Sequence, residues 1–396
     1  MTNPKLLATD GPAISIALGW LDDIAATDDL PLLNVSQAAP AVAPPVALRE
    51  AMADLVLNDT SAHLYGPDLG HPPLRAALAA NIARHYGGAV EAGHVAITAG
   101  CNHAYTAAIA SLATEGDEVI LPTPWYFNHQ MWLTMHGIRP VPLPCDAALL
   151  PDPDEAARLI TDRTRAIVLV SPNNPCGTEY PADLIRAFYT LAQSRGIALI
   201  LDETYRDFHS APGAPHDLFQ DPDWPQTLIH LYSFSKTYRL TGHRVGALVT
   251  SAARLDEIEK FLDCTTICAP QLGQRAALWG LENLGQWVAE ERAEILTRRA
   301  AIEQAFSALD GWTLRGSGAY FAYVDYPGDM HATDFARHLL KNQHILSLPG
   351  AFFTPEGDPA GAKSLRIAFA NIDVTGIDQL HERLSRLSLA PLPASS

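Results

Sequence analysis

Short apolar runs alternate with helical patterns through the middle of the chain. Residues 102–114, 125–136 and 182–195 have the apolar spacing of helices. The apolar runs predict six strands: Val95–Thr98, Val119–Leu121, Ala166–Val170, Ala198–Leu201, Leu228–Tyr232 and Val245–Val249. Strands that are apolar on both faces and separated by helices are typical of a mostly parallel sheet. We therefore predict an α/β fold with helices on both faces of the sheet.

The pattern changes after residue 252, where longer helical stretches are followed by short strands. The predicted elements are helices at 253–263, 270–283, 286–309, 333–342 and 374–387, a hairpin-like region at 312–326, and strands near 345–348 and 364–369. This mixture predicts a second, smaller α+β domain. We assign residues 45–270 to a large domain, and residues 1–44 with 271–396 to a small domain formed from both chain ends.

The composition is that of an ordinary globular protein, with 48% hydrophobic and 18% charged residues among 396. Its 44 acidic residues outnumber its 27 basic ones, which argues against a general binder of nucleic acids or anionic membranes. The five cysteines have no metal-binding spacing, so we expect free thiols and no metal. The N-terminus lacks an apolar signal core, and no apolar run approaches the ~20 residues that span a bilayer. We expect a cytoplasmic protein without membrane contact.

Lys236 lies in an unusual setting for a lysine. It ends the sequence Ser233-Phe234-Ser235-Lys236, directly after a predicted strand, and Arg244 follows eight residues later. A lysine buried at the mouth of a sheet either has a partner or loses its proton and becomes a nucleophile. The serines and the arginine would suit a phosphate beside that amine. Taken alone, the stretch is explained equally well by an ordinary surface lysine.

Polar groups also follow the other predicted strands. The turn Gly100-Cys101-Asn102 opens a helix, whose free N–H groups suit a phosphate. Asn174 lies in an Asn-Pro-x-Gly turn, and Asp202 and Tyr205 follow the next strand. Each has a plain structural explanation by itself, such as turn chemistry or helix capping. Because ligands of such sheets bind at the carboxyl ends of the strands, we expect these groups to share one site with Lys236. A Schiff-base lysine with an acid for the pyridine nitrogen describes a pyridoxal-phosphate site.

With these residues in place, the sequence resembles the class I/II aminotransferases, which are fold-type I pyridoxal-phosphate enzymes. The resemblance runs from about Gln37 to about Ile372, and Ser-x-Ser-Lys-x₇-Arg-x-Gly at residues 233–246 is among its most specific motifs. It implies pyridoxal 5′-phosphate as the cofactor of the large domain, and an amino acid and a 2-oxo acid as substrates. It also implies a homodimer with shared active sites.

The resemblance implies a role for each matching residue. Lys236 would be the Schiff-base lysine that moves the proton at the substrate's Cα, and Asp202 would pair with the pyridinium nitrogen. Tyr205 and Asn174 would bond the phenolic oxygen of the ring, and Tyr65 would reach the phosphate of the neighbouring subunit. The other cofactor-binding residues implied are Gly100, Cys101, Asn102, Tyr126, Ser233, Ser235 and Arg244. The substrate-binding residues implied are Arg366, which would pair with the α-carboxylate, Asn174, and Ala39 in a loop that lacks the family's usual glycines.

The leading interpretation is a transaminase that works by a ping-pong Schiff-base mechanism. A carbon–sulfur lyase, or an elimination enzyme like the aminocyclopropane-carboxylate synthases, would use the same residues with a different pocket. A nicotinamide-binding enzyme is disfavoured, because the nearest fingerprint, Gly316–Phe321, lacks its last glycine and precedes a strand. A regulator that keeps the cofactor fold would need a DNA-reading segment, and the first 30 residues are too short and too acidic for one. The aromatic residues Trp125, Tyr126 and Tyr320 favour a substrate with an apolar or aromatic side chain.

Overall fold

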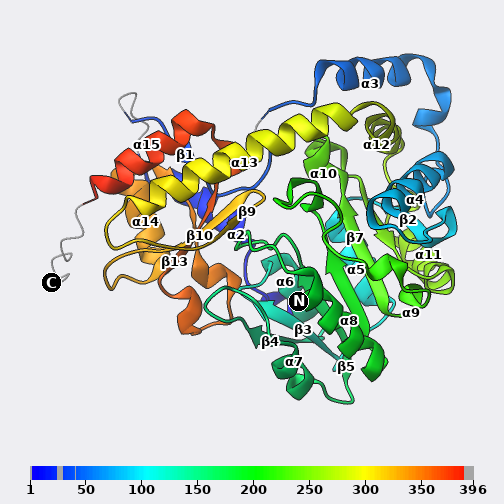
Figure 1. Ribbon diagram of the computed structural model, residues 1–396, viewed down its shortest axis with the longest axis horizontal. Helices are drawn as coiled ribbons and strands as arrows, with labels where there is room; N and C mark the ends of the chain where they lie inside the picture. Colours follow the sequence, from blue (N-terminus) through cyan, green and yellow to red (C-terminus); the bar gives the residue numbers. More distant parts are fainter. Residues whose placement is uncertain (1, 25–29, 41, 388–396) are drawn as a thin grey trace.

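The computed structural model describes residues 2–24, 30–40 and 42–387 (Figure 1). Residues 1, 25–29, 41 and 388–396, which the expected small domain includes, lie outside this description. The first elements are α1 (Pro4–Leu7), α2 (Ala13–Gly19), β1 (Leu33–Asn34), α3 (Val46–Asn58) and α4 (Pro72–Tyr86). Among the described residues, no helix combines the length and apolar character needed to cross a membrane.

A seven-stranded sheet forms the centre of the larger part. Its strands are β2 (Val95–Thr98), β3 (Glu118–Thr123), β4 (Arg139–Pro144), β5 (Thr164–Val170), β6 (Ala198–Asp202), β7 (Leu228–Ser233) and β8 (Gly246–Val249). They lie in the order β2-β8-β7-β6-β5-β3-β4, with β8 antiparallel to both of its neighbours and every other pair parallel. The predicted α/β fold with a mostly parallel sheet is confirmed.

Helices cover both faces of this sheet, as Figure 1 shows. They are α5 (Cys101–Ala110), α6 (Phe127–Met135), α7 (Pro153–Leu159), α8 (Ala182–Arg195), α9 (Trp224–Thr227), α10 (Phe234–Thr237) and α11 (Ala252–Thr266). Neighbouring residues of one strand enter different cores, because side chains alternate across a strand. Ile120 and Leu199 pack in the core that includes α4 and α8, whereas Val119 and Ile200 pack against α5 and α11. Burial on both faces explains why these strands are continuously apolar.

The sequence pattern did not predict β4, which lies at the edge of the sheet. It contains Pro140, Pro142 and Pro144, and proline cannot donate to a strand ladder. Arg139, the residue before the first proline, donates its backbone N–H to the backbone carbonyl of Asp117, the residue just before β3, at 2.8 Å. The prolines therefore alternate with residues that donate inward. No described strand pairs with the other side of β4, so the N–H groups that the prolines lack are not needed there.

The smaller part contains a four-stranded antiparallel sheet in the order β12-β13-β10-β9. The strands and the helices of this region are β9 (Thr313–Gly318), β10 (Phe321–Asp325), β12 (Leu348–Pro349), β13 (Ser364–Ala368), α13 (Gly285–Ser307), α14 (Ala332–Gln343) and α15 (Val374–Ser385). The N-terminal segment joins this part, since β1 pairs with β11 (Ile345–Leu346) and α2 shares its core. By contrast, α12 (Gln271–Asn283) packs on α3 and α4. The domain boundary at residue 270 stays a prediction.

Two glycines allow the two parts to touch backbone to backbone beside the turn that carries Asn174. A Cβ on Gly177 would lie 2.6 Å from the carbonyl oxygen of Phe321, and one on Gly318 would collide with the carbonyl of Gly177. Gly177 also has a φ of 72°, a conformation that side chains disfavour. The turn is thus seated against the β9–β10 hairpin with no side chain between them.

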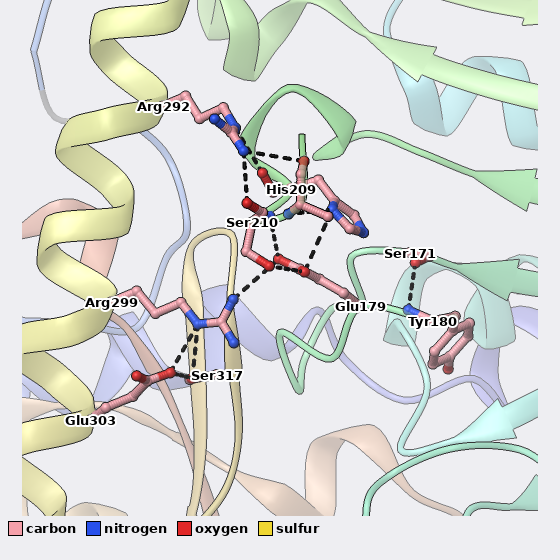
Figure 2. A network of polar contacts seen from close by, with 10 residues as sticks. Ser171, Glu179, Tyr180, His209, Ser210, Arg292, Arg299, Glu303 and Ser317 are labelled. Carbon is pink, nitrogen blue, oxygen red and sulfur yellow. Dashed lines mark hydrogen bonds and ion pairs between the residues drawn. The ribbon is translucent and has the colours of Figure 1, made fainter. Parts of the chain in front are cut away.

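A polar network surrounds this contact (Figure 2). Glu179 accepts from the backbone N–H of Ser210 at 2.8 Å and from Nη1 of Arg299 on α13 at 3.2 Å. Two turns earlier on α13, Arg292 donates to the carbonyl of His209 at 2.7 Å and to that of Ser210 at 2.8 Å. Two arginines of α13 therefore hold loops of the larger part beside the site.

Candidate active site

A cavity of about 400 Å³ lies at the carboxyl ends of β5, β6 and β7, as expected for a parallel sheet. Residues from both chain ends complete its lining, which consists of Pro12, Ile14, Gln37, Ala38, Ala39, Cys101, Asn102, Tyr126, Phe127, Asn128, Val170, Asn174, Asp202, Thr204, Tyr205, Ser233, Ser235, Lys236, Thr241, Arg244 and Arg366. A larger surface cavity, about 730 Å³, lies at the other end of the sheet, where Thr164 and Ala198 begin β5 and β6. It contains none of the predicted groups.

Lys236 is half-buried in this cavity, on the short helix α10 that directly follows β7. Ser233 caps this helix, because its side chain accepts from the N–H of Ser235 at 3.3 Å. The Nζ of Lys236 donates to the carbonyl of Ala38 at 2.5 Å. Removal of water from the ammonium lowers its pKa from 10.5 to about 8, and the charges of Arg366 and Arg244 add to this effect. A neutral amine, the form that attacks carbonyl carbons, is therefore accessible near neutral pH.

Asp202 is the carboxylate at the end of β6, and it is 4% exposed. Burial alone would raise its pKa, but His129 and Thr204 outweigh this effect, so the pKa lies below its ordinary value. The Oδ2 atom lies 3.5 Å from Nε2 of His129, and Oδ1 accepts the N–H of Thr204 at 2.9 Å. The Cys101 thiol also contacts Oδ1, at 3.7 Å. This carboxylate is held ionised and fixed in orientation.

An anion cradle, which we define as Gly100, the N-terminus of α5, Ser235 and Arg244, lies beside Lys236. Gly100 has a φ of 89°, and a Cβ there would collide with the guanidinium of Arg244. Nη1 of Arg244 lies 3.5 Å from Oγ of Ser235 and donates to the carbonyl of Thr241 at 3.0 Å. Within the described residues no carboxylate pairs with Arg244, so its charge is available to a ligand. Free helix N–H groups, hydroxyls and a guanidinium are the donors that phosphates prefer.

Arg366 reaches the cavity from β13 of the smaller part and is only 2% exposed. Its Nη1 donates to Oδ1 of Asn174 at 3.0 Å, and its Nη2 donates to the carbonyl of Ser36. The guanidinium lies over the rings of Phe353 and Phe321, 4.9 and 5.1 Å from their centroids. Burial lowers its pKa to about 10, so it remains charged at neutral pH. Among the described residues it forms no ion pair, and such a buried, uncompensated cation is a receptor for an anion.

Tyr126 and Tyr205 supply two phenols to the same cavity. Burial raises the pKa of Tyr126 to about 12, and burial also raises that of Tyr205, so both keep their protons. The Tyr126 hydroxyl lies 3.4 Å from Oδ1 of Asn102 and accepts from Nδ2 of Asn128 at 2.9 Å. The ring of Tyr205 packs against Tyr320, with centroids 5.3 Å apart. Tyr320 is therefore behind Tyr205 and does not line the cavity, and neither does Trp125.

The structure brings together twelve of the predicted site residues as cavity lining: Ala39, Cys101, Asn102, Tyr126, Asn174, Asp202, Tyr205, Ser233, Ser235, Lys236, Arg244 and Arg366. Gly100 lies behind them, under Arg244. Tyr65 is 80% exposed and lies outside the cavity of its own chain. Sequence reasoning missed His129, although it follows Tyr126 by three residues on a helix and so shares its face. It also missed Pro12 and Ile14, for which the sequence carries no local signal.

The fold is that of the aminotransferases. N-succinyldiaminopimelate aminotransferase from Mycobacterium tuberculosis has a similar structure, with a TM-score of 0.88 and 25% identity over 97% of this chain and 99% of the other. The sequence narrows the class to a family: the profile described as aminotransferase class I and II matches residues 31–384. The chain belongs to this family, whose enzymes use pyridoxal 5′-phosphate.

Two relatives illustrate the range within the family. Aromatic aminotransferase ISS1 of Arabidopsis thaliana is 28% identical over 94% of this chain and 92% of its own length. Arginine–pyruvate transaminase AruH of Pseudomonas aeruginosa is 30% identical over 90% of this chain and 89% of its own length. The predicted family and the predicted transaminase class are confirmed, and the lyase alternative has less support.

Proposed function

We propose that this enzyme moves an amino group between an L-amino acid and a 2-oxo acid, with pyridoxal 5′-phosphate bound beside Lys236. The observation that carries the proposal is the pair of uncompensated cations, Arg366 and Arg244, that share one cavity with a lysine of lowered pKa. One cation suits the carboxylate of the substrate, and the other suits the phosphate of the cofactor.

The donor groups of the cavity fit this cofactor. The anion cradle would hold the phosphate, and Asp202 would hold the ring nitrogen in its protonated form. When bound, the cofactor would supply an electron-withdrawing ring that stabilises negative charge on the Cα of the substrate. Asn174 and Tyr205 would donate to the phenolic oxygen, a role supported by their position in the same cavity.

The protein's own groups would then position the substrate and move one proton. Arg366 would bind the α-carboxylate in bidentate fashion and so aim the Cα–H bond at Lys236. The amine of Lys236, neutral above a pKa of about 8, would take that proton from the Cα and deliver it to the cofactor carbon that accepts the amino group. Because Asn174 contacts Arg366, one side chain would connect the substrate clamp with the ring.

We also propose the homodimer that the sequence resemblance implies. Exposed apolar side chains along α3 and the loop that follows it, Leu57, Leu64 and Tyr65, support an interface there, since monomers seldom expose such a group. Tyr65 would reach the cofactor of the other subunit. A cytoplasmic location stays a prediction from the sequence.

The test is turnover of an amino acid by the purified protein with added pyridoxal phosphate and a 2-oxo acid. We expect a yellow holoenzyme, fixation of the cofactor on Lys236 by borohydride, and no turnover by Lys236→Ala. Steady product formation without any 2-oxo acid would instead identify an elimination enzyme. A protein that stays colourless with added pyridoxal phosphate would refute the proposal as a whole.

A further inference from the structure

Three polar side chains behind Lys236 bond to one another. Oδ2 of Asp207 accepts the hydroxyl protons of Tyr232 at 2.6 Å and of Thr237 at 2.7 Å, and the two hydroxyl oxygens are 3.0 Å apart. We call this set the Asp207 cluster. All three side chains lie outside the cavity lining, so they act on a ligand only through other residues. Their bonds are made within one chain and do not depend on a second subunit.

The cluster holds the helix that carries Lys236. This helix, α10, has only four residues, and a helix so short gains little stability from its own hydrogen bonds. Its start is held by the cap that Ser233 provides, and its last residue, Thr237, is held by Asp207. Because Thr237 directly follows Lys236, the bond to Asp207 restricts the backbone from which the lysine side chain extends.

Asp207 is also close in sequence to a second polar group of the cavity. It lies two residues beyond Tyr205, in the short turn Arg206–Phe208. Nζ of Lys236 lies 5.8 Å from the centroid of the Tyr205 ring. One carboxylate therefore connects the segment of the amine with the segment of the phenol, and under the proposed function both of these groups act on the cofactor.

The hydrogen bonds of the cluster involve a charged acceptor. Tyr232 and Thr237 are 1% and 2% exposed, and the side chain of Asp207 is 19% exposed. Burial, and after it the charge of Asp207, raises the pKa of the Tyr232 phenol well above its ordinary value, so the phenol keeps its proton and donates it. Nε of Arg206 lies 3.6 Å from Oδ1 of Asp207. Hydrogen bonds to such a carboxylate are about twice as strong as bonds between neutral groups.

We propose, building on the proposed function, that Asp207 is a positioning residue for the amino-transfer reaction. Through Thr237 and Tyr232 it holds α10 so that the amine of Lys236 meets the carbonyl carbon of the cofactor and the Cα of the substrate. A displacement of about 1 Å that begins away from the reacting atoms can cost about 100-fold in rate. The proposed carboxylate clamp, Arg366, extends from β13 and not from α10, so substrate binding should change much less.

The alternative explanation is that Asp207 only satisfies two buried hydroxyls. Under that explanation, removal of one hydroxyl would lower the free energy of unfolding and leave the kinetics unchanged. Positioning predicts instead a loss in kcat and in the rate of cofactor addition, because the Lys236 amine acts in both. Kinetic measurements therefore separate the two explanations.

The first variant is Thr237→Val, which replaces the hydroxyl by a methyl group. We expect kcat to fall at least about 10-fold with a KM for the amino donor close to that of the parent, and pyridoxal phosphate to add to the apoenzyme at least about 10-fold more slowly. Thr237→Ser keeps the hydroxyl and should restore most of both rates. Thr250→Val is the matched control, because the buried Thr250 hydroxyl accepts from Arg254 at 2.7 Å and donates to the carbonyl of Leu228, at the opposite end of β7. It should lower stability and leave both rates unchanged.

The double variant Asp207→Ala/Thr237→Val tests whether the carboxylate acts through α10. Because each change breaks the same connection, the double variant should lose less kcat than the product of the two single losses. Losses that multiply would overturn the proposal, as would a Thr237→Val enzyme with the rates of the parent, or equal losses in Thr250→Val. Asp207→Asn keeps the shape of the side chain and serves where Asp207→Ala does not fold; parental rates in this variant would also overturn the proposal.

The parent enzyme separates a failure of this inference from a failure of the proposed function. A parent that stays colourless with added pyridoxal phosphate would refute the proposed function, and the inference with it. A yellow, active parent whose Thr237→Val and Asp207→Asn variants match it in kcat and in the rate of cofactor addition would refute the inference alone.

Discussion

Replacing Arg366 by leucine removes the proposed carboxylate clamp and leaves an apolar side chain among apolar neighbours. The guanidinium is 2% exposed and has no carboxylate partner among the described residues, so a substrate carboxylate would bind it almost free of water. Truncating one partner of such a buried charged pair costs about 2–4 kcal/mol, within the range measured at other interfaces. That corresponds to a rise in KM of about 30- to 700-fold for amino acids and 2-oxo acids alike.

Stability should respond in the opposite direction from activity. Arg366 is a buried cation that no described acid balances, and its burial lowers its pKa to about 10. Its replacement by an apolar residue is therefore expected to leave the Tm unchanged or to raise it. Arg366→Lys keeps the charge but loses the fork that donates to both Asn174 and Ser36, so we expect an intermediate KM.

The assay is steady-state kinetics with one donor and one acceptor, together with thermal unfolding of the same samples. Arg254→Leu is the matched control, because Arg254 also has a pKa lowered by burial but lines the cavity at the other end of the sheet. It should leave KM unchanged. An Arg366→Leu enzyme with the KM of the parent would refute the clamp, and a large loss of Tm would show that Arg366 is a structural residue.

Three further predictions concern the amine, the cradle and the network beside the site. The Lys236 amine is neutral above its lowered pKa of about 8, so the rate at which pyridoxal phosphate adds to the apoenzyme should rise with pH and level off above about pH 8. A rate that continues to rise up to pH 10.5 would indicate an unperturbed lysine. Gly100→Ala should weaken cofactor binding at least about 10-fold in a fluorescence titration, because the added Cβ displaces the guanidinium of Arg244. Gly116→Ala is the control, since Gly116 has a similar φ of 88° but no atom near the position of the added Cβ. It should lower the free energy of unfolding only by the backbone strain of about 1–2 kcal/mol. Glu179→Gln should lower the free energy of unfolding by about 1–3 kcal/mol, because Glu179 pairs with Arg299 at a largely buried contact. Glu257→Gln is the control, and because the pair of Glu257 with Lys260 is exposed, it should change the free energy of unfolding by less than about 0.5 kcal/mol. Equal losses in the two variants would contradict the importance of the network.

Local chemistry made much of the fold and site predictable. Strands such as Ala166–Val170 are apolar on both faces, and the polar residues that follow them, including Asn174 and Asp202, could be assigned to one edge of a sheet. Arg366 is different, because a strand arginine has no local mark of function, and only the family resemblance selected it. The structure adds that this arginine is buried and without an acid among the described residues.

The missed features depend on packing between distant segments. Pro12 and Ile14 line the cavity only because α2 is buried against the smaller part, and no spacing within residues 12–19 predicts that neighbour. Trp125 and Tyr320 were expected near the substrate from their aromatic character. Both are buried instead, where they fill space behind the site, since aromatic residues supply core volume at least as often as binding surface.

The prolines of β4 have a consequence for how copies of this protein can associate. Pro140, Pro142 and Pro144 leave the outer row of this edge strand without N–H donors, so a strand from another molecule would find only acceptors there. Continuous cross-molecular sheets, the first step of many aggregates, are therefore blocked on this side of the domain.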